Sequence, residues 1–240
     1  AEVEALLAEN GQELTYERPH FGVGATIGGM VASGLSGPRR PYAGAVRDAV
    51  LGVRLLNGQG QVLNFGGQVM KNVAGYDVSR LMAGALGILG VLLEVSLKVT
   101  PRPIGRMTLV HEQGLDEALA RLRRLSRRAL PITATAWSRG RFYIRIAGSE
   151  EALAESHRLI GGVPAVEADA FWTDLREHRL GPLIDSTATR RPLWRLSLPP
   201  ATSAEALEPL NVDQTEPDQL VERGGAQRWL RSGLEPDLIQ

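Results

Sequence analysis

Glycine crowds one short stretch of the chain, and this feature constrains the fold more than any other. Six glycines fall between residues 22 and 37: Gly22, Gly24, Gly28, Gly29, Gly34 and Gly37. Because glycine has no β-carbon, it tolerates positive φ angles and lets a ligand approach the backbone closely. Exposed backbone N–H groups in series form concave anion sites suited to a pyrophosphate. Glycine richness alone favours this interpretation and simple surface turns about equally.

Polar side chains in the same stretch suit a phosphate ligand. Ser33 and Ser36 offer hydroxyl groups, and Arg39 and Arg40 would offset phosphate charge. The widespread phosphate motifs are missing, however. The sequence contains no GxxxxGK, and no GxGxxG follows a strand and opens a helix, so neither a P-loop nor a Rossmann fingerprint is present.

A second glycine cluster spans residues 84–91, with glycine at every third position leading into a strand. This spacing lets the backbone lie close to something flat or bulky. Close packing of a helix on a sheet is an alternative, and the spacing alone slightly favours it.

Composition excludes several classes of function. The 240 residues carry 27 basic and 27 acidic side chains, so no global field favours nucleic acid as a partner. The absence of cysteine excludes disulfides, iron–sulfur ligation by this chain and covalent cofactor attachment through sulfur. The four histidines are scattered, and no metal site is expected. The longest apolar run, residues 81–93, is too short to span a membrane.

The pattern of apolar residues divides the chain near residues 101–103. Before this point it predicts a helix over 1–10, a hairpin of strands 49–56 and 62–65, a short helix from 76–77, and a strand alternating from Val91 to Val99. We interpret both chain ends as cut from a longer polypeptide.

After residue 103, helices and strands alternate. Strands are predicted at 108–111, 142–146 and 194–198, helices at 115–125 and 150–160, and a long loop over 199–222. The arginines of the first helix are expected on a solvated face. This order predicts an α+β domain of ferredoxin-like character.

Several motifs together are far more specific than either glycine cluster. They are Ala25-Thr26-Ile27-Gly28-Gly29, YAGAVRD at 42–48, Gly75-Tyr76-Asp77, GALGILGVLLEVSLKVTPRP at 84–103 and GGAQRWL at 224–230. Their combination resembles the second half of the FAD-binding domain of the vanillyl-alcohol-oxidase type. More narrowly, it is similar to the FAD-binding subunits of bacterial glycolate oxidases.

The resemblance implies an α+β fold. Residues 1–103 would be the second lobe of a PCMH-type FAD-binding domain, an antiparallel sheet with flanking helices. Residues 104–240 would be a ferredoxin-like cap, incomplete at its C-terminus. The family's first lobe, with its own pyrophosphate loop, would precede residue 1, so the piece alone would hold FAD poorly or not at all.

The resemblance also implies which residues approach a non-covalent FAD. Segments 19–26 and 32–36 would line the flavin and its pyrophosphate, segment 87–91 would approach by main chain, and Asp48 would support the loop of Gly44. The residues expected at the cofactor are Pro19, His20, Gly22, Gly24, Ala25, Thr26, Ile27, Gly28, Gly29, Ala32, Ser33, Gly34, Ser36, Gly44, Asp48, Gly87, Gly90 and Val91.

The implied activity is oxidation of glycolate or a related 2-hydroxy acid to the 2-oxo acid, with electrons leaving through a partner subunit. The implied partners are a second flavin subunit and an iron–sulfur subunit. The expected location is cytoplasmic, peripheral at the inner membrane through those partners. No catalytic base is identified. The alternatives are a stand-alone FAD-dependent D-lactate or 2-hydroxy-acid dehydrogenase, and a non-catalytic assembly subunit.

Overall fold

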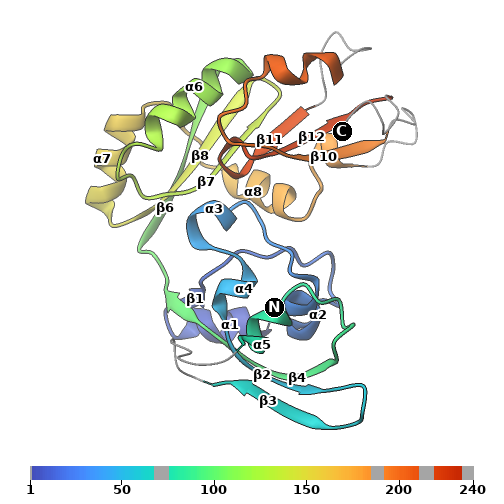
Figure 1. Cartoon of the computed structure of the whole chain (residues 1–240). Helices are drawn as coiled ribbons and strands as arrows, with labels where there is room; N and C mark the ends of the chain where they lie inside the picture. The colour runs from blue at the N-terminus through green and yellow to red at the C-terminus, as the bar shows by residue number, and fades with distance from the viewer. Residues whose placement is uncertain (1, 68–75, 185–191, 211–218, 234–240) are drawn as a thin grey trace. The chain divides into compact units, whose positions relative to one another are not determined.

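The computed structural model describes residues 2–67, 76–184, 192–210 and 219–233 (Figure 1). The chain divides into two compact units, Ala1–Arg102 and Pro103–Gln240.

An antiparallel sheet of three strands, in the order β3-β2-β4, is the centre of the first unit. The strands are β2 (Val50–Leu56), β3 (Val62–Gly66) and β4 (Val91–Leu97). The predicted turn joins the first two, because the side-chain oxygen of Asn57 accepts hydrogen bonds from the Gln59 and Gln61 amides at 2.9 Å each. This confirms the hairpin predicted from the sequence.

The strand predicted from Val91 to Val99 is two strands, which corrects the prediction. After β4 ends, β5 (Val99–Pro101) pairs with β1 (Gln12–Leu14) in a separate two-stranded sheet. The alternation continues across the break because Val95, Leu97 and Val99 all pack against the same core. The apolar pattern therefore records the shared core and not the change of partner strand.

Short helices cover this core. They are α1 (Glu2–Glu9), α2 (Ile27–Ser33), α3 (Arg40–Ala43), α4 (Val46–Ala49) and α5 (Val78–Leu81). The core contains Val31 from α2, Val46 from α4 and Val53 from β2, and Met82, which follows α5, is 2% exposed. Asp77 caps α5, since its carboxylate accepts from the Arg80 amide at 3.1 Å. The helices predicted over 1–10 and after 76–77 are thus present.

A seven-stranded antiparallel sheet forms the second unit, in the order β10-β12-β11-β7-β8-β6-β9. Its strands are β6 (Gly105–Glu112), β7 (Ile132–Ser138), β8 (Arg141–Gly148), β9 (Val163–Pro164), β10 (Leu193–Ser197), β11 (Gln219–Glu222) and β12 (Gln227–Arg231). Its helices are α6 (Leu115–Leu125), α7 (Glu150–Ile160) and α8 (Ala168–Arg176), with 3₁₀ turns at Gly181–Leu183, Glu205–Leu210 and Arg223–Gly225.

The first part of this unit has ferredoxin-like topology, as predicted. The chain order β6-α6-β7-β8-α7-β9 is a βαββαβ repeat, and the first and third strands lie side by side between the other two. The predicted last strand, 194–198, is not part of this repeat. It is β10, at the edge of a three-strand extension, and the very short β9 takes its place.

The apolar residues of this sheet belong to two separate clusters. Leu109, Ile144 and Ile146 pack with α6 and α7, whereas Ala134 and Ala136 pack with α8. The sheet is therefore covered by helices on both faces. The loop predicted over 199–222 is wrong at its end, because Gln219–Glu222 form β11, a strand whose four residues are all buried.

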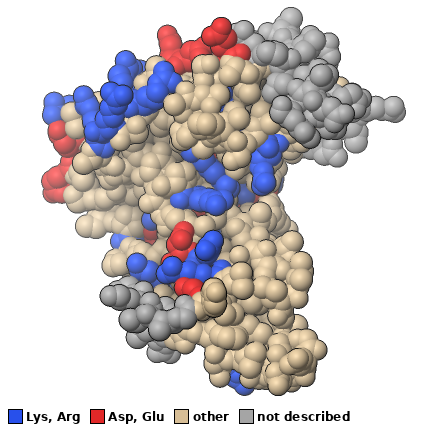
Figure 2. Space-filling view, in the orientation of Figure 1, with Lys and Arg blue, Asp and Glu red and all other residues tan. Residues whose placement is uncertain are grey.

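The arginines in α6 and just after it lie as predicted, with one exception. Arg123, Arg124, Arg127 and Arg128 are exposed, and Figure 2 shows basic side chains gathered over this helix. Arg121 instead is half-buried and donates to the Gln113 side-chain oxygen at 3.0 Å. No helix within the described ranges is long and apolar enough to cross a membrane.

Candidate functional site

The first glycine segment presents bare, exposed backbone. Residues 21–26 are all exposed, and Phe21 and Gly22 have φ angles of 51° and 119°. A β-carbon placed on Gly22, Gly24 or Gly28 would meet nothing within 4 Å. Packing against the described residues thus does not require glycine at these positions, and the open space beside them suits a ligand that lies against the main chain.

Thr26 separates this loop from helix α2. Its hydroxyl accepts from the Gly29 amide at 3.0 Å, which caps the helix. Ala25 and Thr26 are exposed, whereas Ile27 packs against the core and anchors the helix below the loop. The exposed loop is therefore held at its C-terminal side by an ordinary helix cap.

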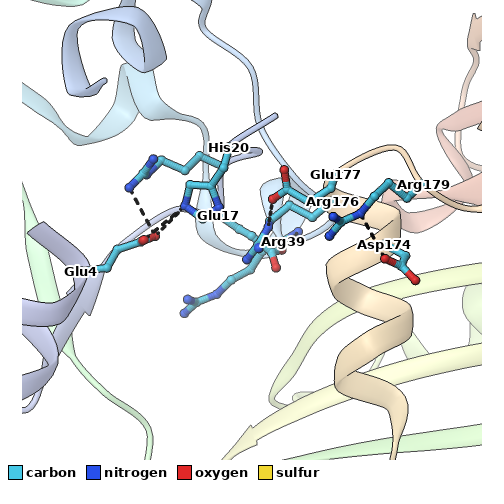
Figure 3. Close-up of polar contacts among 9 residues, drawn as sticks. Glu4, Glu17, His20, Arg39, Asp174, Arg176, Glu177 and Arg179 are labelled. Atoms are coloured by element: carbon cyan, nitrogen blue, oxygen red, sulfur yellow. Dashed lines mark hydrogen bonds and ion pairs between the residues drawn. The ribbon is translucent and has the colours of Figure 1, made fainter. Parts of the chain in front are cut away.

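Pro19 and His20 lie at the N-terminal side of the loop, and both are half-buried. The His20 Nε2 atom lies 3.1 Å from one carboxylate oxygen of Glu4, and the other oxygen lies 3.4 Å from an Arg18 guanidinium nitrogen (Figure 3). Arg18 is 4% exposed. This cluster joins the start of the loop to α1 and holds the His20 ring in place.

The two glycine segments meet at the C-terminal end of α2. Gly34 ends the helix with φ 64°, the left-handed conformation that glycine adopts readily. The Gly84 amide donates to the Val31 carbonyl at 3.0 Å, and the Leu86 amide donates to the Ala32 carbonyl at 2.8 Å. Segments that are about fifty residues apart in sequence thus form one continuous stretch of backbone.

At two of the predicted glycines, close packing within the chain also leaves no room for a side chain. A β-carbon on Gly34 would lie 2.9 Å from the Gly84 α-carbon, and one on Gly90 would lie 2.6 Å from the Leu56 carbonyl oxygen. Gly87, with φ 79°, has open space instead, and Val91 at the start of β4 is 60% exposed. The segment therefore combines tight packing with an exposed surface.

The predicted serines and Asp48 are engaged within the chain. Ser33 donates to the Met30 carbonyl at 3.1 Å, and Ser36 is buried. An Asp48 carboxylate oxygen accepts from the Ala45 amide at 2.8 Å, and the same oxygen would lie 3.0 Å from a β-carbon on Gly44. Asp48 thus supports the loop that contains Gly44, whose φ is 81°.

A buried tyrosine stiffens α2 from below. Tyr16 is 3% exposed, and its hydroxyl donates to the Met30 sulfur at 3.2 Å. Burial raises the pKa of this hydroxyl well above its ordinary value of 10, with a smaller opposing effect of Arg18. The side chain therefore remains neutral, as its apolar surroundings require.

A cavity of about 410 Å³ opens next to the junction of the two glycine segments. Arg40, Arg47 and Arg80 line it, together with Ser33, Gly34, Asp48 and Gly84. Of the two arginines singled out in the sequence, only Arg40 reaches this cavity. Arg39 instead donates to a Glu13 carboxylate at 2.7 Å, so its charge is taken by the fold.

Sequence analysis missed Arg47 and Arg80 as part of this cavity. They are 33 residues apart and on different helices, so only the folded chain brings them together. Gly75 of the Gly75-Tyr76-Asp77 motif lies outside the described residues. Within those residues, no group of three His, Cys, Asp or Glu side chains is placed to hold a metal ion.

Known proteins are similar to this chain in sequence. Residues 1–66 match the family described as FAD binding domain. Over 237 residues the chain is 45% identical to the glycolate oxidase subunit GlcE of Escherichia coli (strain K12), covering 99% of this chain and 64% of that subunit. The resemblance predicted from the sequence is thus confirmed, and the chain spans less than two thirds of this relative.

Two other similarities bear on the chain. A D-lactate dehydrogenase of Anaerostipes hadrus is 36% identical over 97 residues, which are 40% of this chain and 20% of that enzyme. The structure of an alkyldihydroxyacetonephosphate synthase superposes with a TM-score of 0.67 at 15% identity, covering 99% of this chain and 57% of the other. The latter confirms the predicted PCMH-type α+β fold.

Proposed function

We propose that this chain is the larger part of an FAD-binding subunit of a glycolate oxidase complex. The complex would oxidise glycolate or a related 2-hydroxy acid to the 2-oxo acid and pass the electrons from flavin to a partner subunit. The observation that carries the proposal is the junction of the two glycine segments by the Gly84–Val31 and Leu86–Ala32 hydrogen bonds. The similarity to GlcE over 237 residues supports glycolate oxidation as the reaction in which this junction takes part.

The residues at this junction fit a dinucleotide. Open space beside Gly22, Gly24 and Gly28 leaves room for a group lying on the backbone. Exposed apolar side chains flank it, among them Phe21 at 54%, Leu86 at 70% and Ile88 at 82% exposure. A planar aromatic ring system would cover such side chains favourably, at about 25 cal/mol for each Å² of apolar surface removed from water.

The two units take different roles in the proposal. Residues 1–103 are the second lobe of the FAD-binding domain, and residues 104–240 are the cap that shapes the substrate side. The segments 19–29, 32–36 and 87–91, with Gly44 and Asp48, hold the cofactor by main-chain contacts. We propose that the FAD is bound non-covalently. This chain has no cysteine and so offers no sulfur for a covalent bond to the flavin.

Bound FAD would supply the redox chemistry by accepting the α-hydrogen of the hydroxy acid as hydride. The chain's own residues bind and orient, and none of them is assigned as the base that takes the hydroxyl proton. A chain without cysteine cannot ligate an iron–sulfur cluster by thiolates. The proposed partners are therefore a second flavin subunit and an iron–sulfur subunit, with the complex cytoplasmic and peripheral at the inner membrane.

A second candidate is a stand-alone FAD-dependent D-lactate or 2-hydroxy-acid dehydrogenase. The similarity to the Anaerostipes hadrus enzyme favours it, but only over 97 residues, whereas the similarity to GlcE extends over 237. A third is an assembly subunit that keeps the fold without the flavin.

Purification of the full-length protein with its co-expressed neighbours separates these candidates. A glycolate oxidase subunit should co-purify in a stable complex and hold about one FAD per copy. Its flavin absorbance should bleach when glycolate is added without oxygen. A solitary yellow protein bleached by D-lactate would support the second candidate. Colourless protein after incubation with excess FAD would refute both enzyme assignments.

A further inference from the structure

Arginines from three separate helical segments line the cavity beside the glycine junction. Arg40 comes from α3, Arg47 from α4 and Arg80 from α5. Among the described residues that line the cavity, Asp48 is the only one with a carboxylate, and one of its oxygens already accepts from the Ala45 amide. The cavity is therefore rich in positive charge and in unused N–H donors.

The three arginines differ in how far their charge is neutralised. The Arg80 Nε atom lies 3.3 Å from an Asp77 carboxylate oxygen, in a pair that is about 40% exposed. The side chains of Arg40 and Arg47 have no hydrogen bond or ion pair with any part of the chain that the structure describes. Both side chains are exposed. Two arginines that line the cavity thus carry a positive charge without a partner among the described residues.

Like charges that share a cavity repel each other, and a bound anion relieves that repulsion. Arginine suits this role because its planar fork donates two parallel hydrogen bonds to phosphate oxygens. Two unpaired guanidinium groups match a ligand with about two negative charges. A single carboxylate would leave one of them unneutralised.

We propose that Arg40 and Arg47 bind the phosphate oxygens of a ligand in this cavity, with Arg80 as a third contact. The inference rests on the function proposed above for the identity of the ligand. Gly34 and Gly84, from the two glycine segments, line the cavity. Helix α2, which separates the exposed loop from Gly34, is only about 10 Å long at 1.5 Å per residue. The diphosphate of FAD is thus one source of such oxygens, and free phosphate is the other.

Binding measurements on the full-length apoprotein test this site. ADP, inorganic phosphate and glycolate are titrated separately by calorimetry into the wild type, R40Q, R47Q and the double variant. R54Q is the control, because Arg54 lies on the exposed side of β2 in an exposed pair with Glu94. FAD retained per protein is measured for each by absorbance, and folding is checked by circular dichroism.

The expected result is a loss of at least tenfold in ADP affinity for each single variant and no change for R54Q, because a hydrogen bond to a charged group contributes roughly 1.5–3 kcal/mol. A parallel fall in FAD retention would identify the diphosphate as the source. Phosphate binding that depends on both arginines, with FAD retention unchanged, would identify free phosphate.

Two outcomes would overturn the proposal. One is ADP and phosphate affinity within twofold of wild type in the folded double variant. The other is arginine-dependent binding of glycolate alone, which would make the cavity a carboxylate site. A wild-type protein that never binds FAD but binds phosphate through Arg40 and Arg47 would refute the proposed function and leave this site standing.

Discussion

Gly34 and Gly84 approach so closely that a β-carbon on Gly34 would lie 2.9 Å from the α-carbon of Gly84. Next to this contact, the Gly84 amide donates to the Val31 carbonyl at 3.0 Å. The C-terminal end of α2 and the segment before β4 are thereby fixed to one another. Any account of ligand binding by this unit has to start from that fixed junction.

Substitution of Gly34 should destabilise the first unit, whereas substitution of Gly28 should not. Gly34→Ala places a β-carbon against Gly84 and strains a backbone at φ 64°, which costs about 2 kcal/mol or more. Gly28→Ala meets open space within α2 and should leave stability unchanged or raise it by up to about 1 kcal/mol.

All four tryptophans lie in the second unit, so their fluorescence does not report on this change. Native-state hydrogen exchange of the Gly34 and Gly84 amides does. Equal protection in the two variants would show that the junction is not tightly packed.

A larger side chain at Gly28 should separate folding from cofactor retention. Gly28→Val adds a branched side chain at a position where a β-carbon would meet no described residue within 4 Å outside its own helix backbone and chain neighbours, so the fold should survive. In the full-length protein the same side chain should intrude on the proposed cofactor surface and abolish flavin retention. Absorbance of purified protein measures this. Full flavin occupancy in folded Gly28→Val would remove residues 22–28 from the site.

The elements that could be predicted from the sequence are those whose apolar residues recur at regular spacing. Helices α6 and α7 were found within their bounds because their apolar residues recur on one face and their ends are marked by Gly114 and by Ser149, which caps α7. The hairpin at Asn57 followed from similar local signals, whereas β7 and β9, which complete the βαββαβ order, were not among the predicted strands. Helix α2 was not predicted, because two glycines near its start contradict helix propensity and its stability comes from Thr26 and the core.

The features that the sequence did not predict depend on contacts between residues that are distant in sequence. Strand β12 contains Arg228, which is 1% exposed and donates to the Ser203 carbonyl at 2.9 Å. Polar residues normally indicate an exposed segment, so no local pattern could place this strand in the sheet. The same limit applies to the site. Glycine content indicated the two segments, but their junction and the convergence of Arg47 and Arg80 exist only in the folded chain.

Glu222 in β11 should be important for the stability of the second unit. Its carboxylate is 4% exposed and accepts from Gln227 Nε2 at 2.7 Å and from Trp229 Nε1 at 2.8 Å. Glu222→Leu would leave both buried donors without this acceptor, at a cost of about 1–3 kcal/mol each. Glu222→Gln keeps one carbonyl acceptor and should cost less. Urea unfolding followed by tryptophan fluorescence compares the two, and equal midpoints would contradict a role for these bonds.

The stability of the second unit should fall in acid, partly because of His111. Burial, reinforced by the positive charge of Arg121, lowers the pKa of this ring below its ordinary 6.5. The unfolded chain therefore takes up a proton below pH 6.5 while the folded chain does not. The native state loses stability as the pH falls from 6.5 toward the folded pKa, by at most about 1.4 kcal/mol per pH unit.

His111→Phe should abolish this part of the acid sensitivity. The ring is retained, and the Nε2 atom has no hydrogen-bond partner in the described structure, so little should be lost at neutral pH. Other charged groups line the same pocket, namely Glu112, Glu117, Arg121 and Arg141, and they remain in the variant. Urea midpoints between pH 7.5 and 5 should therefore decline less steeply in His111→Phe than in the wild type. His157→Gln is the control, because His157 lies on α7 with its ring on the exposed surface near Gly162. Parallel declines in all three proteins would show that His111 titrates as it does in the unfolded chain.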